Sequence, residues 1–581
     1  MGVPILAFQV RVSRIVVTVA STLPMFIPME TTIAQSLPDS QATVKHLHSM
    51  QARFERIRRN RLPVTFGSTG GSRCDAYVGR FCYWHDDRDW EAPEEHPQVS
   101  RERLRLLSQL DSAAARFPGD GWIAGQQIRY RVEIGQLSEA LAITRGCRAP
   151  TWWCRALEGY VHHTRGEFAA ADSTFSIALA AMSDERECEW RDVSFLLQGD
   201  SRDTYRHREC PGRRELEDRM WWLSDPLYLM PGNERRTEHY SRLVVNEMML
   251  ESAYPRTMPW GRDNRELLVR FGPTIGWERK SSSATSIGST GSVVGYHRKD
   301  SWHFVPTADY LRDLSTIRVG EWDLEPDRPV ERYGVAYSHE FAKLTHNLYV
   351  FRDRDSALVV AACVSPTPDE TETVESGMVI TADETSTPVT ARGYQCQVMV
   401  AQVPIRPALV SIEAVSGSDS IAARSRYWLD IPAHLSGGDA SDLSISDLML
   451  LAPAHESPDR LELAIPLAMP SSSVTSGHEI GLYWEVYGLN RHSDSLQFSL
   501  SVDKIGKSFL RRAAEWAGFA RPSNDLIQVK WTEPVLNMGT VKRGITLRLT
   551  EDMDGTYVIR LTATSATGKR VMATNVIEVV R

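Results

Sequence analysis

Two histidines and an aspartate stand close together in the segment GYHRKDSWHF, which makes it the best candidate for acid–base chemistry in this sequence. Histidine titrates near neutral pH and a neighbouring carboxylate can orient its ring, so Asp300 could prepare His297 or His303 for proton transfer. The alternative is an exposed loop at a strand edge, with its polar side chains in water. We favour the exposed loop. His297 and His303 are kept as candidate binding residues, and no catalytic residue is assigned.

Other signatures of catalysis or cofactor binding are incomplete. The segment HEFAKLTH places His339 and His346 too far apart for the helical zinc-protease motif, whose histidines lie one turn apart. The glycine-rich GSTGGSR lacks the lysine of a phosphate-binding loop, and the sequence contains no G-x-S-x-G elbow. We therefore predict no cofactor and no metal. A metal or ligand loop in the acidic segment 75–87 is the open alternative.

Charged side chains are densest after the tryptophan pair of WWLSDPLYLMPGNERRTEHYSR, where Glu238 and Arg242 form a favourable pair one helical turn apart. As a recognition surface, this segment would bind a carboxylate of a partner through its arginines. As a structural support, its arginines would be neutralised internally by Asp225, Glu234 and Asp263. The structural interpretation is favoured. The candidate binding residues of the segment are Arg235, Arg236, His239 and Arg242.

The same region runs into PWGRDNRELLVRFGP, in which a Trp-Gly-Arg-Asp turn is expected to open a short apolar strand. The turn keeps Trp260 and Asp263, and Gly272 and Pro273 end the expected strand. On these residues the chain resembles the GWxTD domain, a bacterial extracytoplasmic module of unknown activity. The resemblance covers roughly residues 215–305.

The match departs from the family pattern at three positions. Pro259 stands in place of the glycine of the turn, Arg262 in place of its threonine, and Thr274 in place of the second proline after the strand. Trp260 and Asp263 are kept as candidate binding residues. Their expected roles are structural: a buried indole, and a carboxylate that accepts backbone N–H groups or pairs with an arginine.

The first 34 residues have the layout of a secretory signal. Arg11 and Arg14 precede an apolar run, and Ala34 offers a small residue for cleavage. The run is short and broken by prolines, which is unfavourable for a membrane span. We expect a mature chain that starts near Gln35, with an uncleaved anchor or a plain buried helix as alternatives. The predicted location is periplasmic or secreted, with no stable transmembrane span after processing.

Export favours disulfides over free thiols or metal for the eight cysteines. Sequence order alone cannot choose among the possible pairings, although short local bridges are expected at the first two pairs of neighbours. The neighbours are Cys74 with Cys82, Cys147 with Cys154, Cys188 with Cys210, and Cys363 with Cys396.

Size and charge limit the classes of function. A chain of 581 residues is too long for one hydrophobic core, and its 42% apolar content is enough to fold about three or four domains. Its 66 basic and 74 acidic residues leave no basic field that could hold a phosphate backbone. We therefore predict no nucleic-acid partner.

The segment 41–61 is expected to form a solvated amphipathic helix, and helical periodicity continues from about residue 100 to 199. Within the second stretch, a turn that starts at Gly135 recurs at Gly166, each time followed by small residues that let two antiparallel helices approach closely. This pattern resembles the tetratricopeptide repeat in a contracted register. Such helix pairs bury their faces by stacking on one another, so a solenoid is expected.

From Tyr333 onward, short runs rich in Val, Ile, Leu, Thr and Tyr alternate with turn residues, which predicts antiparallel sandwiches. The run NLYVFRDRDSALVVAACV reads as a hairpin that turns near Arg354 and Asp355, and LELAIPLAM reads as a strand. We divide the chain into a signal peptide at 1–34, a helix with a Cys-rich loop at 35–98, TPR-like repeats at 99–212, a small α+β GWxTD-like module at 213–331, and β-sandwiches at 332–441 and 442–581.

The predicted function is that of an exported, non-enzymatic interaction or scaffold protein of the bacterial cell envelope. It would bind a protein partner through the repeats or the GWxTD-like module. The alternative is a hydrolase or carbohydrate-active protein with its site between this module and the first sandwich, using His297, His303 or Asp263. A carboxylate within hydrogen-bond reach of a histidine in a pocket there would favour the enzyme.

Overall fold

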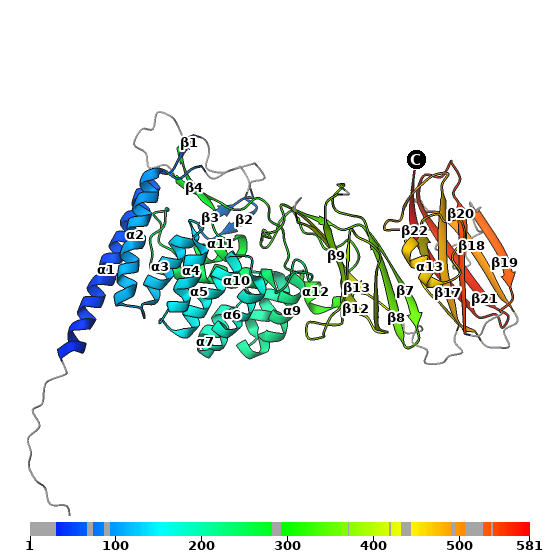
Figure 1. Cartoon of the computed structure of the whole chain (residues 1–581), viewed down its shortest axis with the longest axis horizontal. Helices are drawn as coiled ribbons and strands as arrows, with labels where there is room; N and C mark the ends of the chain where they lie inside the picture. Colours follow the sequence, from blue (N-terminus) through cyan, green and yellow to red (C-terminus); the bar gives the residue numbers. More distant parts are fainter. Residues whose placement is uncertain are drawn as a thin grey trace, which may run out of the picture.

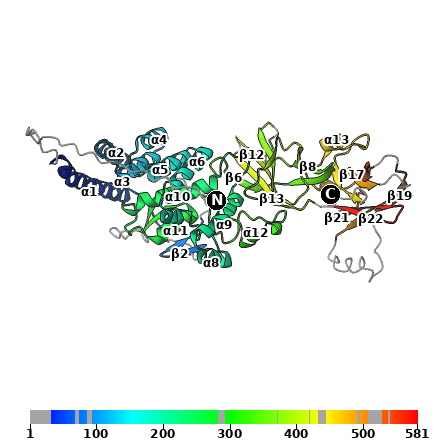
Figure 2. The same cartoon turned by 90° about the horizontal axis from the view of Figure 1, so that it is seen from below.

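The computed structural model has a helical N-terminal part followed by a part built of several antiparallel sheets (Figure 1). A second view, turned by 90°, shows the same order along the long axis of the molecule (Figure 2). The structure describes residues 31–66, 74–85, 93–281, 292–369, 371–417, 420–431, 443–489, 495–505, 527–535 and 539–581. Most of the predicted signal peptide lies outside these residues.

The helices before the first long strand pair up in the predicted places. Gly135 and Gly166 have positive φ values, 73° and 76°, and each turns the chain between two neighbouring helices. The helices of this part are α1 (Thr31–Asn60), α2 (Pro97–Arg116), α3 (Gly121–Val132), α4 (Leu137–Gly146), α5 (Thr151–Thr164), α6 (Phe168–Ala180), α7 (Asp184–Arg191), α8 (Gly199–His207), a 3₁₀ turn at Cys210–Arg213, α9 (Arg214–Ser224), α10 (Glu234–Leu250) and α11 (Arg262–Phe271).

Helix α1 is longer and less solvated than the sequence pattern indicated. It begins at Thr31, next to the predicted cleavage site, and packs Leu47 and Phe54 against the core of α2 and α3. Within that core, Glu55 accepts hydrogen bonds from Arg129 (3.0 Å) and from the hydroxyl of Tyr130 (2.8 Å). The apolar spacing of three and four residues therefore marks a buried face rather than a solvated helix.

The segment after the Trp-Gly-Arg-Asp turn corrects one prediction: Arg262–Phe271 is helix α11, not a strand. Its buried residues Leu267, Leu268 and Phe271 follow helical spacing. The side chain of Asn264 also accepts the N–H of Gly261 (3.2 Å), which satisfies a donor at the start of the helix. By pattern alone, a short run of apolar residues fits a strand as well as a helix. Here the run forms a helix, and the Asn264 contact caps its start.

Two small β units lie beside α11. The hairpin of β2 (Ala76–Val78) and β3 (Phe81–Tyr83) packs Val78 and Tyr83 on Leu267 and Phe271. A three-stranded sheet joins β1 (Val64–Phe66), β4 (Gly276–Ser281) and β5 (Ser292–Tyr296), with β1 parallel to β4 and β5 antiparallel to it. Figure 1 shows both units on the same side of the helical part.

One hydrophobic core runs from the helix pairs into the first group of sheets. The segment between them, which includes α12 (Ala308–Arg312) and a 3₁₀ turn at Leu314–Thr316, contributes Trp302, Phe304 and Tyr333 to that core. The first group has a five-stranded sheet in the order β10-β9-β12-β13-β6 and a three-stranded sheet in the order β11-β8-β7. Its strands are β6 (Glu340–Lys343), β7 (His346–Asp353), β8 (Ser356–Cys363), β9 (Val374–Thr381), β10 (Val389–Tyr394), β11 (Met399–Pro404), β12 (Ala408–Ser416) and β13 (Ile421–Leu429).

The predicted hairpin of β7 and β8 is present and turns through Arg354, whose φ is 55°. Alternate residues of these strands belong to different cores. Val350 and Val359 face the core shared with the helices, whereas Phe351 and Val360 face the core of the second group of sheets. Strands buried on both faces read as continuous apolar runs, as LVVAAC does here.

The second group contains β14, β15, β17 and β20 in one sheet, and β16-β22-β21-β18-β19 in another. The run LELAIPLAM is not the predicted strand but a turn of helix, because Pro466 cannot donate to a strand ladder while Leu461 and Ala464 share a buried helical face. The elements are β14 (Ser444–Ile445), β15 (Met449–Leu451), α13 (Leu461–Ala464), a 3₁₀ turn (Ile465–Leu467), β16 (Ser473–Thr475), β17 (Glu479–Leu489), β18 (Leu496–Lys504), β19 (Ile527–Glu533), β20 (Gly539–Arg548), β21 (Gly555–Ser565) and β22 (Arg570–Val580).

All eight cysteines are paired in four disulfides, and each bridge joins neighbours in the sequence. The two bridges expected to be short and local, Cys74–Cys82 and Cys147–Cys154, are among them. Cys188–Cys210 ties α7 to the 3₁₀ turn before α9, and Cys363–Cys396 ties the end of β8 to the loop before β11.

Candidate functional site

The arginine-rich helix α10 is largely turned inward. Arg235 is fully buried, and its Nε donates to Glu331 Oε2 at 3.0 Å. Glu331 also accepts the N–H of Phe304 (2.7 Å) and lies 3.2 Å from Nδ1 of His303. Burial raises the pKa of Glu331, but Arg235 and His303 outweigh it and hold that pKa near about 2.

The other candidate binding residues of α10 also find partners inside the protein or lie out of reach. Arg242 donates to the carbonyl oxygens of Val269 (2.8 Å) and Arg332 (2.9 Å) and pairs with Glu238 (2.6 Å). His239 is fully buried, and burial together with Arg235 and Arg242 keeps its pKa well below the usual value. These three side chains are therefore not part of the surface that a partner could reach.

Arg236 is the more accessible member of the cluster. Its Nε donates to Asp172 Oδ1 of helix α6 at 2.9 Å, and about a third of the side chain is exposed, at 30%. Internal neutralisation of the arginines was predicted, and the expected pair of Glu238 with Arg242 is present. The partners of Arg235 and Arg236 are Glu331 and Asp172 rather than the predicted Asp225, Glu234 and Asp263, because other elements of the fold bring these carboxylates closer.

Glu234 pairs with tyrosines instead of arginines. Its carboxylate accepts hydrogen bonds from the hydroxyls of Tyr333 (3.0 Å) and Tyr337 (2.5 Å) in a site from which water is excluded. Burial raises the pKa of Glu234 to about 7, although the two tyrosine hydrogen bonds lower it. The carboxyl therefore holds a proton in the folded protein at a pH where it would be ionised in the unfolded chain.

We expect Glu234→Gln to flatten the pH dependence of stability between pH 5 and 8. With a folded pKa of about 7 against 4.5 for the ordinary group, Glu234 contributes stability that is fully present below about pH 4.5. That stability is lost as pH rises through 7, by on the order of 3 kcal/mol. Denaturant unfolding of both proteins at several pH values measures this. Parallel stability curves for the two proteins would contradict the assignment.

The Trp-Gly-Arg-Asp turn is held by the β2–β3 hairpin. Asp263 Oδ1 accepts from Nη2 of Arg80 at 2.8 Å and from the N–H of Asn264 at 2.9 Å. Gly79 permits this approach, since a Cβ at its position would lie 2.6 Å from Cβ of Asp263. Arg80 lowers the pKa of Asp263 to about 2. The geometry matches the structural role expected for Asp263, with Arg80 as its partner.

Trp260 is half-buried rather than buried between a helix and a strand. Its indole N–H donates to Asn246 of α10 (2.9 Å), and its ring packs edge-on against Tyr254, with centroids 5.3 Å apart. The predicted strand that was to cover the other face is helix α11. Truncation of this tryptophan to alanine is therefore not expected to cost as much stability as truncation of a fully buried one.

The three residues of GYHRKDSWHF point in different directions. His303 is buried beside Glu331, and residues 301–306 are buried as a whole, so the expected exposed loop is wrong for this part, whereas residues 297–300 are half-buried or exposed. Asp300 lies 2.9 Å from Nδ1 of His339. Among the described residues, no hydrogen bond joins Asp300 to His297 or His303. His297 instead lies near the backbone of Gly272 and Phe271, which raises its pKa, although burial lowers it more.

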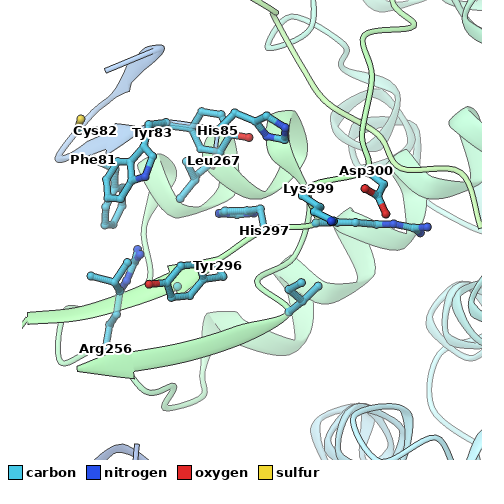
Figure 3. Close-up of a pocket in the computed structure, with 15 residues that line it drawn as sticks. Phe81, Cys82, Tyr83, His85, Arg256, Leu267, Tyr296, His297, Lys299 and Asp300 are labelled. Atoms are coloured by element: carbon cyan, nitrogen blue, oxygen red, sulfur yellow. The ribbon is translucent and has the colours of Figure 1, made fainter. Parts of the chain in front are cut away.

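His297 lies in the wall of a cleft between the helices and the two β units. The cleft has two chambers, of about 250 and 350 Å³, whose linings share Arg256, Leu267, Ile275 and His297. In Figure 3, His297 lies between Tyr83 and Leu267 on one side and Tyr296 on the other, with Arg256 at one end and Asp300 at the other. Burial, Arg256 and Arg242 lower the pKa of His297 to about 4, so its ring is neutral at pH 7.

The smaller chamber is open towards the disulfide-bridged hairpin, which contributes Phe81 and Tyr83. The larger chamber is bounded by Val132 and Tyr160 of the helix pairs, by Met248 of α10, and by Trp277 of β4. Phe81, Arg256 and Trp277 were not identified from the sequence. Arg256 lies in a Tyr-Pro-Arg loop that matches no known motif. The cleft forms only when segments far apart in the chain come together.

Within the described ranges, no group of three or more His, Cys, Asp or Glu side chains is placed to bind a metal ion. Two acids of the open metal-loop alternative, Asp86 and Asp87, lie outside those ranges, whereas Asp75 accepts the N–H of His85 at 2.6 Å. No helix in the described part of the chain has both the length and the apolar content that a membrane crossing requires.

Comparison with known proteins shows weak structural likeness only. No family model and no curated protein matches the chain. Among solved structures, red sea bream transglutaminase is 10% identical with a TM-score of 0.13, and the match covers 41% of this chain and 31% of that one. Bacteroides uniformis β-glucuronidase is 7% identical with a TM-score of 0.16, over 39% and 26%. The chain thus spans about a third or less of these proteins.

Proposed function

We propose that the protein is an exported, non-enzymatic binding protein of the bacterial cell envelope. In this proposal, TPR-like helix pairs and a GWxTD-like module hold a protein partner, and two β-sandwiches follow as a stalk. The observation that carries it is the cleft, whose lining is shared by α3, α5, α10 and the β4–β5 unit. Helices α3, α5 and α10 share one hydrophobic core, and a wall held by a common core reduces the entropy lost on binding.

Two further features support an extracytoplasmic location. All eight cysteines are paired, and disulfides persist in oxidising compartments. The predicted signal peptide at 1–34 is the other feature, and its expected cleavage site lies in the first turn of α1, which begins at Thr31. Both features belong to one interpretation, in which the chain folds after export.

The test places a photoreactive amino acid at Met249, which lines the larger chamber. Irradiation of envelope fractions should give one defined crosslinked protein, identified by mass spectrometry. The matched control carries the same group at Met572 of β22, which is 47% exposed and far along the chain. The same adduct from both positions, or none from Met249, would count against a partner at the cleft.

A hydrolase is the second candidate, favoured by one contact. Asp300 lines the smaller chamber and lies 2.9 Å from Nδ1 of His339, the kind of carboxylate–histidine pair that can move a proton. His339 is 71% exposed, so a substrate could reach it. Turnover of ester, peptide or glycoside substrates that is lost in His339→Gln would favour this candidate over the binding protein.

A further inference from the structure

Arg256 differs from the other arginines around the cleft because its guanidinium donates to no acceptor among the described residues, whereas Arg298, which also has no acid partner, donates to the carbonyl oxygen of Gly334 (3.2 Å). Arg58 donates to Glu133 (3.1 Å), Arg129 to Glu55 (3.0 Å) and Arg80 to Asp263. Among the described residues, neither a carboxylate nor a backbone carbonyl accepts a hydrogen bond from Arg256. The guanidinium remains charged at all ordinary pH values, so it is a partly buried cation without a counter-ion.

Two aromatic rings hold Arg256 in place. Its guanidinium carbon lies 4.8 Å from the ring centre of Phe81 in the β2–β3 hairpin and 5.2 Å from that of Trp277 in β4. Such contacts orient a guanidinium while leaving its N–H groups free to donate. These contacts compensate for only part of the solvation free energy that a cation loses on burial. Water or an anionic ligand in the cleft must provide the remaining stabilisation of the charge.

A second polar group without a partner lies in the same wall. Nδ1 of His297 is buried and makes no hydrogen bond among the described residues. Arg256 and His297 are both in the lining that the two chambers share, and Figure 3 shows Tyr296 next to both of them. Next to them, the larger chamber is lined by the apolar side chains of Val245, Met248 and Leu268.

We propose that the cleft binds a carboxylate that carries an apolar or aromatic group, with the carboxylate on Arg256 and the apolar group in the larger chamber. The guanidinium fork matches the two carboxylate oxygens in charge and geometry. A volume of about 350 Å³ is in the range of small-molecule sites and accommodates one large side chain. The inference rests on the proposed binding function, because it names the chemistry of the group that the partner would present.

The same chemistry could come from a free acid or from the C-terminal residue of a partner chain. Calorimetric titration of the whole protein with N-acetyl-L-phenylalanine and with its amide isolates the carboxylate. We expect the acid to bind about 10-fold to 100-fold more tightly than the amide, as for a hydrogen-bonded ion pair. A peptide that ends in phenylalanine should bind more tightly still if the source is a chain end, and equally if it is a free acid.

Substitution of Arg256 provides the decisive comparison. Arg256→Gln should lose the preference for the acid, whereas Arg256→Lys should keep part of it. The melting temperature of ligand-free Arg256→Gln should stay unchanged or rise, because no internal ion pair is broken. Equal affinities of wild type for acid and amide, absence of binding by both, or undiminished binding of the acid by Arg256→Gln would each overturn the proposal.

The result of these titrations can be distinguished from the result of the crosslinking test at Met249. A protein adduct at Met249 together with no preference for the carboxylate would leave the binding function in place and remove Arg256 as its anion site. Binding of the free acid without any protein adduct would instead retain the site and remove the protein partner.

Discussion

Replacing Glu413 with alanine is expected to lower the free energy of unfolding by about 3 to 5 kcal/mol, the usual cost of removing one partner of a buried ion pair. Glu413 is fully buried on β12, and its Oε1 lies 3.2 Å from Nη2 of Arg426 on the neighbouring strand β13. Its two oxygens also accept the N–H groups of Tyr228 (3.1 Å) and Leu229 (2.9 Å). The Ser411 hydroxyl donates to Oε1 as well (2.6 Å), so alanine would leave a buried cation and three donors without their acceptor.

The contact matters because it joins the helical part to the first group of sheets. Arg426 donates to the carbonyl oxygens of Leu223 and Asp225, both at 2.8 Å, and its guanidinium lies 3.7 Å from the ring centre of Tyr228. Arg424 donates to Asp225 and Pro226, also at 2.8 Å. The segment SDPLYL thus binds the sheet through its own backbone, and loss of Glu413 removes the counter-charge at that junction.

Denaturant unfolding of Glu413→Ala and wild type measures the effect. The matched control is Glu375→Ala, on strand β9 of the same sheet, where the side chain is exposed and the expected change is within about 0.5 kcal/mol. Glu413→Gln should fall between the two, because an amide oxygen still accepts one N–H but carries no charge. Equal stability of the two alanine variants would show that the junction does not depend on the ion pair.

The junction illustrates which features could be predicted from the sequence. The segment WWLSDPLYLMPG stood out by its residue types, but its partner Glu413 lies 185 residues away from Tyr228, in a strand with no distinguishing motif. Short-range patterns report local structure, whereas a buried charge pair between distant strands depends on the tertiary arrangement. The same holds for Glu331, which pairs with Arg235 96 residues earlier in the chain.

Local patterns predicted the elements they directly encode. Turn glycines at positions 135 and 166 and the continuous apolar strands of the β7–β8 hairpin were found because these patterns arise from backbone geometry or two-sided burial. Predictions from short apolar runs failed. RELLVRF and LELAIPLAM were expected as strands but form helix, because only neighbours in space decide such runs.

The candidate site was only partly predictable for the same reason. His297 was found because histidine in a polar segment is visible by type. Arg256 was not, since its distinction is that its guanidinium has no hydrogen-bond acceptor among the described residues, which no one-dimensional pattern contains. The cysteines of the segment that covers Arg256 predicted a bridged loop, but the β2–β3 hairpin and its contact with Asp263 depend on the fold.

Arg235→Met is expected to cost about 3 to 5 kcal/mol at pH 7, because it leaves the Glu331 carboxylate ionised in a fully buried site. Glu331 would keep the N–H of Phe304 and its approach to His303, but not the charge that holds its pKa near about 2. Since the folded pKa is depressed, the pair contributes stability above about pH 4.5, and that stability is lost as pH falls towards 2. The cost of Arg235→Met should therefore be smaller at pH 4 than at pH 7.

Adding Glu331→Gln to Arg235→Met should recover part of the loss, because the unpaired charge is then removed while one acceptor for the N–H of Phe304 remains. Arg236→Met, one position along the same helix, is the matched control. Its pair with Asp172 is partly exposed, at 30% and 22%, and its loss should cost less than about 1 kcal/mol. Chemical denaturation of wild type, Arg235→Met, Glu331→Gln, the double variant and Arg236→Met at both pH values forms the test. A cost for Arg235→Met no larger than that for Arg236→Met, or an additive double variant, would mean that the buried pair contributes no more than a surface contact.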